Sequence, residues 1–275
     1  MTFSTLARKA LTAAAGIAVT VGLSGGSAIA LTITQESSNN LLTSLLGNTS
    51  GLSNFSVTSS GDAQAFGLFT NDTTLGLGSG AVLSTGRVVE IPGQNTSNSD
   101  LSTNLSGTDN INLSVTFDAD ASVDKLFFQY VFGSDEFKEF VGSSFNDSFE
   151  LLLNGVNLAK LSNGNLVTIN NLPSTNPDYI DNPVGSGTSV KLDGFTKVLT
   201  FEGLLNKSAS NTLSINIKDV GDEIYDSAVF IKGGTLGVTP PSDIPTPALL
   251  PGLIGMAFGV LRKRKAEAAE QESDA

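Results

Sequence analysis

Hydrophobic and polar residues alternate along several short segments in the middle of the chain. The segments 111–117 and 212–220 have an apolar residue at almost every second position. Side chains of a β-strand point to opposite faces in turn, so this period of two predicts strands that are buried on one face only. Other segments are apolar almost throughout, which predicts strands inside a sheet that is covered on both faces. These segments are 125–132, 148–155, 196–203 and 227–234.

Turn-forming residues separate these segments, and patterns typical of helices are scarce. A single short helix is predicted at 40–46. The polar segment 93–107 and the proline-containing segment 171–188 are predicted to be exposed loops. The pattern therefore predicts an all-β domain over residues 31–237, most simply a two-layer β-sandwich that is jelly-roll-like.

The first thirty residues have the three parts of a secretory signal peptide. Arg8 and Lys9 form a basic start, the uncharged segment 10–23 follows, and small residues stand at Ala28 and Ala30. Because signal peptidase reads small residues at these two positions, we expect residues 1–30 to be a signal peptide that is removed after Ala30. The alternative interpretation is an amphipathic or buried helix.

The C-terminal part of the chain has the pattern of a membrane anchor. Residues 238–247 are rich in proline, which predicts a linker. The uncharged segment 244–261 would be about 27 Å long as a helix, close to the thickness of a membrane core. We expect a single C-terminal transmembrane helix at 248–261. The basic cluster 262–265 follows, so the positive-inside rule predicts a cytoplasmic tail at 262–275. The alternative interpretation is a core helix with a basic cap.

This end of the chain resembles the PEP-CTERM family of sorting tails. The PTPA variant of the family motif is matched by Pro245, Thr246, Pro247 and Ala248. A short apolar segment and a basic cluster then follow, as in the family. The resemblance implies recognition by an exosortase-type membrane protease and export to the surface of a Gram-negative bacterium. The acidic extension 266–275 is a departure from the family pattern.

The composition excludes several kinds of chemistry. The chain contains no Cys, no His and no Trp. It therefore has no disulfides, lacks the usual zinc ligands and cannot use nucleophile–base pairs built on Cys or His. The formal net charge is −12, which repels nucleic acid and favours solubility and divalent cations. We therefore expect no nucleic-acid partner.

Four segments of the central part resemble the choice-of-anchor L domain family. They occur in the order of the family and span most of the chain: 75–86, 127–155, 193–201 and 217–236. The resemblance implies a secreted domain that occurs with several kinds of surface anchor, and it implies no particular biochemical activity. Phe137 stands where tyrosine is common in the family.

Acidic residues and phenylalanines gather between Gly133 and Glu150. The first interpretation is a packed aromatic corner, in which the acids accept hydrogen bonds from backbone N–H groups of turns. The second is a calcium site, since calcium takes oxygen ligands and the segment 219–226 carries a second acidic run. It requires that the loops after strands 125–132 and 212–220 meet. The predicted ligands are Asp135, Glu136, Asp147 and Asp222.

The third interpretation of the same region is an active site. Glycosidases place two carboxylates across a sugar, and residues 135–150 offer such pairs. Aromatic platforms for sugars are scarce, because the chain has no Trp and only three Tyr. We therefore expect no catalytic residues, no enzyme activity and no cofactor apart from calcium.

Together these patterns predict an exported bacterial protein. Its precursor is expected in the inner membrane, and its later location at the cell surface or in the extracellular matrix. The expected partners are signal peptidase, an exosortase-type protease and exopolysaccharide. The expected role is adhesion or a structural part in the matrix, and the alternative is a surface polysaccharide hydrolase that uses carboxylates of the 135–150 region.

Overall fold

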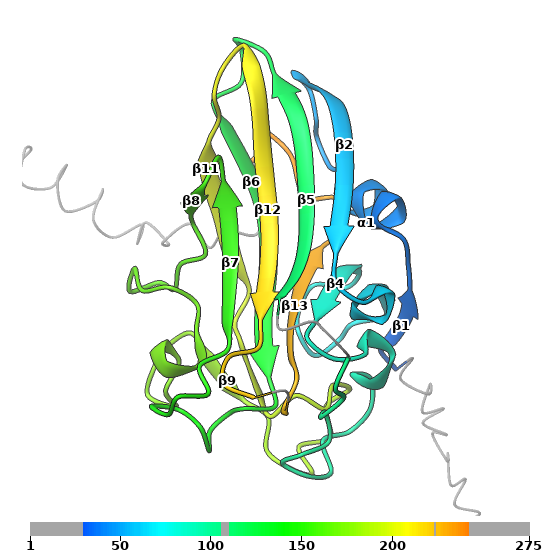
Figure 1. The fold of residues 1–275 in the computed structure, drawn as a ribbon, viewed down its shortest axis with the longest axis vertical. Coiled ribbons are helices and arrows are strands. Elements are labelled where there is room, and N and C mark those ends of the chain that lie inside the picture. Colours follow the sequence, from blue (N-terminus) through cyan, green and yellow to red (C-terminus); the bar gives the residue numbers. More distant parts are fainter. Residues whose placement is uncertain (1–29, 106–109, 223, 242–275) are drawn as a thin grey trace, which may run out of the picture.

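The computed structural model describes residues 30–105, 110–222 and 224–241, and this part of the chain forms two sheets packed face to face (Figure 1). Every strand pair in it is antiparallel. The eight-stranded sheet contains, in spatial order, β1 (Thr32–Gln35), β3 (Phe66–Thr70), β4 (Gly80–Ser84), β13 (Ser227–Lys232), β6 (Lys125–Ser134), β10 (Gly194–Thr196) and β9 (Tyr179–Asp181), with β11 (Leu199–Leu204) also paired to β6. The five-stranded sheet contains β2 (Leu52–Ser60), β5 (Asn110–Ala119), β12 (Ala209–Lys218), β7 (Ser148–Leu153) and β8 (Val156–Asn157).

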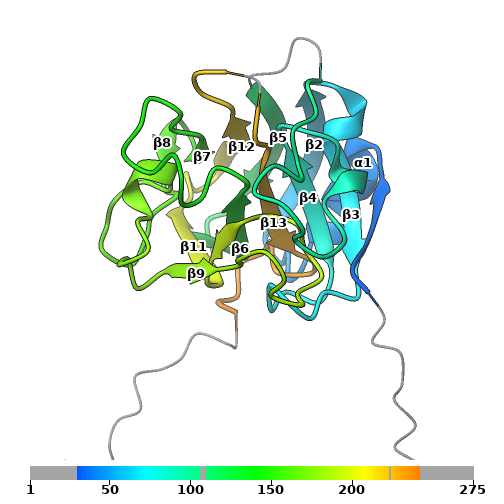
Figure 2. The same cartoon turned by 90° about the horizontal axis from the view of Figure 1, so that it is seen from below.

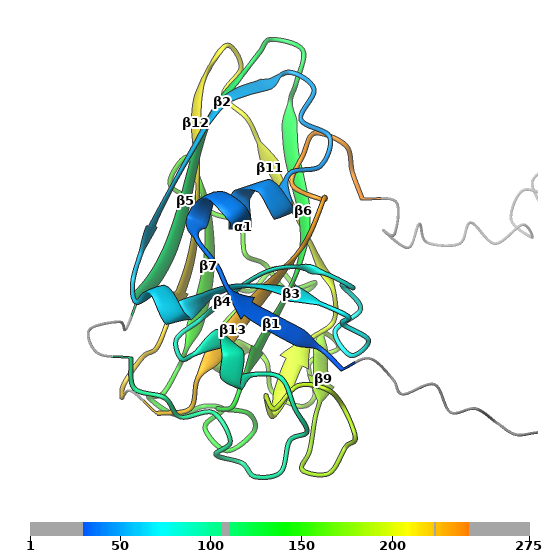
Figure 3. The same ribbon diagram turned by 90° about the vertical axis from the view of Figure 1, so that its right-hand side faces the viewer.

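The helix α1 (Ser38–Leu45) lies across one open side between the two sheets (Figure 3). It buries three leucines and contacts β2, β3 and β4. The short helix predicted at 40–46 is thereby confirmed, with its ends shifted by one or two residues. Three single 3-10 turns complete the described helices: η1 (Ala63–Ala65), η2 (Val88–Glu90) and η3 (Ile169–Asn171).

The predicted two-layer β-sandwich is confirmed. No helix among the described residues is long and apolar enough to cross a membrane. The transmembrane helix predicted at 248–261 lies outside the described residues, and so stays a prediction.

The two strictly alternating segments form the middle of the five-stranded sheet. On β5 and β12, residues that point inward are buried and those that point outward are partly or fully exposed, apart from Ala209 at the start of β12 and Asn216. The register places Val115 opposite Leu213 and Leu113 opposite Ile215, so apolar residues meet across the two strands. Each such pair contributes to the core, because directly opposed side chains of antiparallel strands are in contact.

The central strands β6 and β13 are buried on both faces, as their continuous apolar sequence predicts. Phe128, Tyr130 and Phe132 point into the core between the sheets, whereas Val131 and Phe230 belong to a second apolar cluster on the outer side. Loops cover this outer side. Figure 2, which views the sandwich from below, shows loops crossing in front of β13.

The prediction that segment 93–107 is an exposed loop is wrong in part. Asn95, Leu101 and Leu105 are all 5 % exposed or less. Leu101 packs into the outer cluster, since a sheet that is apolar on both faces needs a cover on each. A mostly polar loop can supply that cover with one or two leucines.

Three other expectations need correction. The segment 148–155 forms β7 and the turn after it, and the residues of β7 alternate between buried and partly exposed instead of being covered on both faces. The segment 196–203 is divided between β10 and β11, and β11 alternates in the same way. The predicted loop 171–188 contains the short strand β9. β7 and β11 alternate because each strand has one face on the core and the other toward solvent.

The aromatic corner predicted from the sequence is present. Phe132, Phe137 and Phe149 are fully buried in the core. Phe132 and Phe149 stack with ring centroids 6.4 Å apart, and Phe137 meets Phe132 edge to face. Phe140 and Phe145 are only partly buried, and their ring centroids lie 5.4 Å apart in an edge-to-face contact. These contacts fix the loop that leads from β6 to β7.

Candidate functional site

The four residues predicted to bind calcium lie in loops at one end of the sandwich, the lower end in Figure 1. Asp135 and Glu136 directly follow β6, and Asp147 directly precedes β7. Asp222 lies between β12 and β13. The strand register joins the end of β12 to the start of β7, and the end of β6 to the start of β13. The loops after strands 125–132 and 212–220 therefore meet, as expected.

Asp135 and Glu136 point to different sides of the sheet, although both are only 1 % exposed. The Asp135 carboxylate accepts a hydrogen bond of 3.1 Å from the Leu101 backbone N–H, on the outer side. Glu136 lies near the charges of Asp147 and Asp222. Successive residues at the end of an extended strand alternate in direction, which separates the two carboxylates.

Asp147 is fully buried and joins several elements. Its Oδ1 accepts a hydrogen bond of 2.9 Å from the Val220 backbone N–H, and its Oδ2 lies 2.7 Å from the Ser227 hydroxyl. That hydroxyl lies 2.8 Å from the hydroxyl of Ser134, which accepts a hydrogen bond from the Glu136 backbone N–H. Asp147 thus connects β6, β13 and the loop after β12, which is the structural role of the first interpretation.

Two further buried polar residues lie beside Asp135, and no sequence pattern pointed to either as a site residue. Asn95 is 1 % exposed and Asp193, just before β10, is 4 % exposed. The Asn95 Nδ2 donates hydrogen bonds to Asp193 Oδ1 at 2.5 Å and to the Asn182 backbone oxygen at 2.8 Å. We call Asn95, Asp135 and Asp193 the outer polar group. The one signal in the sequence is that Asp193 stands between the apolar residues Leu192 and Phe195, next to a glycine.

Burial raises the pKa of five buried carboxyls at this end of the sandwich. It raises the pKa of Asp135 to about 8 and that of Asp193 to about 7. Burial, followed by the charge of Asp147, raises the pKa of Glu136 to about 9. Burial also raises the pKa of Asp147 to about 6 and that of Asp226 to about 7. None of the ion pairs among the described residues includes one of these five carboxyls.

Asp226 contributes a third carboxylate to the outer side of the sheet. It precedes β13, and its Oδ2 accepts a hydrogen bond of 3.1 Å from the Thr103 backbone N–H. The carboxylate lies directly against Gly86, where an added Cβ would be only 1.9 Å from that oxygen. Glycine at position 86 therefore makes room for the buried acid, and sequence patterns had not indicated this pair.

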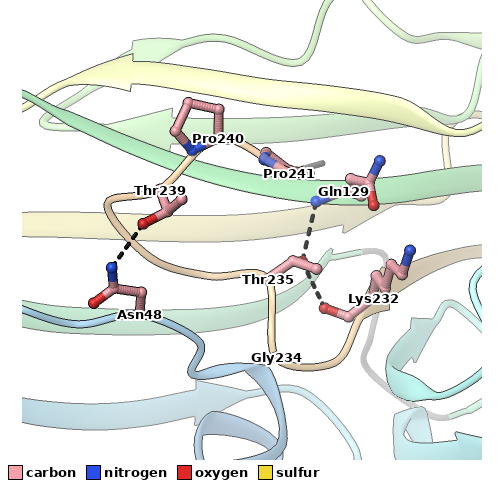
Figure 4. A pocket seen from close by; sticks show the side chains of 8 residues that line it. All are labelled: Asn48, Gln129, Lys232, Gly234, Thr235, Thr239, Pro240 and Pro241. Carbon is pink, nitrogen blue, oxygen red and sulfur yellow. Dashed lines mark hydrogen bonds between the residues drawn. The ribbon is translucent and has the colours of Figure 1, made fainter. Parts of the chain in front are cut away.

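A cavity of about 310 Å³ lies in another part of the domain, beside β6 (Figure 4). It is lined by Asn48, Gln129, Lys232, Gly234, Thr235, Thr239, Pro240 and Pro241. The Thr235 hydroxyl accepts a hydrogen bond from the Gln129 backbone N–H and donates one to the Lys232 backbone oxygen. None of the lining residues is acidic. This cavity therefore lacks the carboxylate pair that glycoside hydrolysis requires.

Within residues 30–105, 110–222 and 224–241, no three acidic side chains lie close enough together to hold a metal ion. The set of Asp135, Glu136, Asp147 and Asp222 is instead divided between the two sides of the eight-stranded sheet. Calcium binding by these four residues stays a prediction.

Most residues of the predicted processing sites lie outside the described part of the chain. These are Ala28, Pro245, Thr246, Pro247 and Ala248. Ala30 is the first described residue and is exposed, whereas the next residue, Leu31, is 4 % exposed. The signal peptide, the transmembrane helix and the cytoplasmic tail therefore remain predictions, and the linker is described only as far as Pro241.

Comparison with known proteins gives one match. A family model described as the choice-of-anchor L domain matches residues 30–237, which is nearly the whole described domain. No curated protein and no solved structure matches the chain.

Proposed function

Because the chain belongs to the choice-of-anchor L domain family, which indicates an exported, surface-associated protein, we propose that its β-sandwich binds polysaccharide at the surface of a bacterium. Its role in this proposal is adhesion or a structural part in the extracellular matrix. Catalysis has no part in it.

One observation carries the proposal: the outer face of the five-stranded sheet presents rows of hydroxyl and amide side chains. The strand register aligns them in three rows: Ser56–Thr116–Thr212, Thr58–Ser114–Ser214–Leu152 and Ser60–Asn112–Asn216–Glu150. Most of these side chains are exposed or partly exposed. In Figure 1 this sheet faces the viewer, and no other described segment crosses in front of β12.

The chemistry of this face fits a neutral polysaccharide. Hydroxyl and amide groups both donate and accept hydrogen bonds, as sugar hydroxyls do. Adjacent strands lie about 4.8 Å apart, so an extended sugar chain meets one polar side chain after another. The one acid in the rows, Glu150, is paired with Lys218 at 2.9 Å. The net charge of −12 disfavours an acidic polysaccharide.

The buried carboxylates argue against the hydrolase alternative. Asp135, Glu136 and Asp147 are each 1 % exposed or less. A glycosidase must place both carboxylates against the sugar, which requires an open cleft. Asp147 is in addition fully engaged by Val220 and Ser227. Of the five acids in residues 135–150, only Glu139 and Glu150 are exposed or partly exposed.

Transport and sorting complete the proposal. Cleavage by signal peptidase after Ala30 would leave Leu31 as the first residue, directly before β1 and already part of the outer apolar cluster. Residues 248–261 would hold the precursor in the inner membrane, with 262–275 in the cytoplasm. An exosortase-type protease would then act at the PTPA motif and release the sandwich to the cell surface or the matrix.

The test is retention of the purified full-length chain on extracellular polysaccharide isolated from the producing cells. Ser114→Glu places a charge in the middle row and is expected to abolish retention. Thr200→Glu, the matched control, places the same charge at an exposed position of β11 on the other sheet and is expected to change nothing. Equal retention of both variants and the wild type would contradict the proposed surface. Release of reducing sugar ends that Asp135→Asn abolishes would favour the hydrolase.

A further inference from the structure

The outer polar group contains three buried oxygen atoms that have no hydrogen-bond partner in the described part of the protein. They are Asn95 Oδ1, Asp135 Oδ1 and Asp193 Oδ2. Each of the three side chains is held by its other polar atom: Asn95 by its Nδ2, Asp193 by its Oδ1 and Asp135 by its Oδ2. A buried polar atom without a partner is costly and calls for an explanation such as a bound ion.

The three side chains come from distant parts of the chain and lie near one another. Asn95 Nδ2 contacts Asp193 Oδ1 at 2.5 Å, across 98 positions of sequence. Asp193 is the first of the charges that act on Asp135. Further hydrogen bonds fix their loops: the Asp193 backbone oxygen accepts from the Asn182 N–H, and Asp226 donates its N–H to the Leu101 backbone oxygen. The oxygens are thus positioned by the fold before any ligand arrives.

We infer that Asn95, Asp135 and Asp193 bind one calcium ion through these three oxygens. Calcium takes oxygen ligands from carboxylates and amides and tolerates irregular geometry, with water or backbone oxygens completing its shell. The two carboxylates would balance its double charge. This site shares only Asp135 with the set predicted from the sequence, and it needs just two acidic side chains. The inference is independent of the proposed function.

Protonation is the competing explanation, because burial raises the pKa of both Asp135 and Asp193 into or above the neutral range. A carboxyl proton can also be donated to the Asn95 oxygen, so protonation would satisfy the same oxygens as a calcium ion. The two explanations differ in what asparagine does at position 193. If the carboxyl is only protonated, calcium stabilises neither the wild type nor the Asp193→Asn variant. If calcium binds, the substitution removes an effect that the wild type shows.

The first experiment compares the melting temperatures of the full-length chain in millimolar calcium, in chelator and in sodium at matched ionic strength. We expect calcium to raise the melting temperature of the wild type by several degrees, because an ion that binds only the folded state stabilises it. Asp193→Asn and Asp135→Asn are expected to lose this rise without becoming less stable in chelator. Asp147→Asn, the matched control in the inner network, is expected to keep it.

The second experiment locates the ion directly with terbium, a luminescent substitute for calcium. The Tyr179 ring lies against Gly194, the residue after Asp193, and the charge of Asp193 acts on the Tyr179 hydroxyl, so this tyrosine is near the site. Terbium luminescence excited through tyrosine is expected in the wild type, with calcium competing. It should be weak in Tyr179→Phe, which keeps the calcium-dependent rise in melting temperature.

Two outcomes would overturn the inference. One is a melting temperature that calcium, sodium and chelator leave equal. The other is a calcium effect that survives in Asp193→Asn and Asp135→Asn but is lost in Asp147→Asn, which would assign the ion to the inner residues. Retention on polysaccharide is measured separately in chelator, so failure here leaves the proposed function standing.

Discussion

Replacing Asp147 with asparagine should remove a defined part of the pH dependence of stability. The carboxylate is fully buried, accepts a hydrogen bond from Val220 and contacts the Ser227 hydroxyl. The charge of Asp222 raises the pKa of Asp147, and the charge of Asp147 in turn raises the pKa of Glu136 and of Asp226, so all the charged neighbours are acidic. Burial is the main cause that raises its pKa, from 3.8 to about 6. Asparagine keeps an oxygen for the Val220 N–H and does not titrate.

The sign follows from proton binding. The folded protein binds the proton of Asp147 more tightly than the unfolded chain does. The free energy of unfolding is therefore larger below pH 4, and it falls as the pH rises from about 4 to about 6. A shift of about two pKa units corresponds to roughly 3 kcal/mol. The difference in unfolding free energy between wild type and Asp147→Asn should change by about this amount between pH 4 and pH 7.

The assay is urea unfolding at a series of pH values in excess chelator, followed by circular dichroism. Chelator removes divalent cations, and equal slopes of free energy against urea show that both proteins unfold to similar states. The wild type should lose stability relative to the variant as the pH rises. A difference that stays constant from pH 4 to pH 7 would refute the reasoning, and so would one that changes in the opposite direction.

Three further predictions concern the core and the ends of the chain. Phe201→Ala should lower the free energy of unfolding by about 3–5 kcal/mol, because its buried ring stacks in the core. Leu204→Ala, on the same strand but 71 % exposed, should cost about 0.5 kcal/mol or less, and urea unfolding separates the two. Mass spectrometry of the exported protein should find Leu31 as its first residue; peptides that span the cleavage point as the main species would exclude this. A reporter fused after Ala275 should be active only in the cytoplasm, and periplasmic activity would reverse the topology.

The architecture of the sandwich was predictable where neighbours in sequence determine burial. Alternation along 111–117 and 212–220 reports a strand with one face on a core, and β5 and β12 are such strands. A largely apolar segment does not show where the chain leaves one strand and enters the next, so the sequence of 196–203 did not reveal its division into β10 and β11.

The outer polar group was not predictable, because its members meet only through the fold. Asn95 lies in a polar loop that looked exposed, and Asp193 is almost a hundred residues away. Asp135 and Glu136, which are adjacent in sequence and looked like partners, are separated by the alternation of β6. Spacing along the chain tells which residues share a loop, whereas burial of that loop depends on what covers the sheet.

Radical footprinting of the full-length chain, with and without polysaccharide, tests the central claim most directly. Leu152 reports on the outer face of the five-stranded sheet, since it lies in the middle row and is partly exposed. Leu204 reports on the other sheet. The account predicts that polysaccharide protects Leu152 from oxidation and leaves Leu204 unchanged. Protection of Leu204 alone, or of neither residue under conditions where the chain is retained, would contradict it.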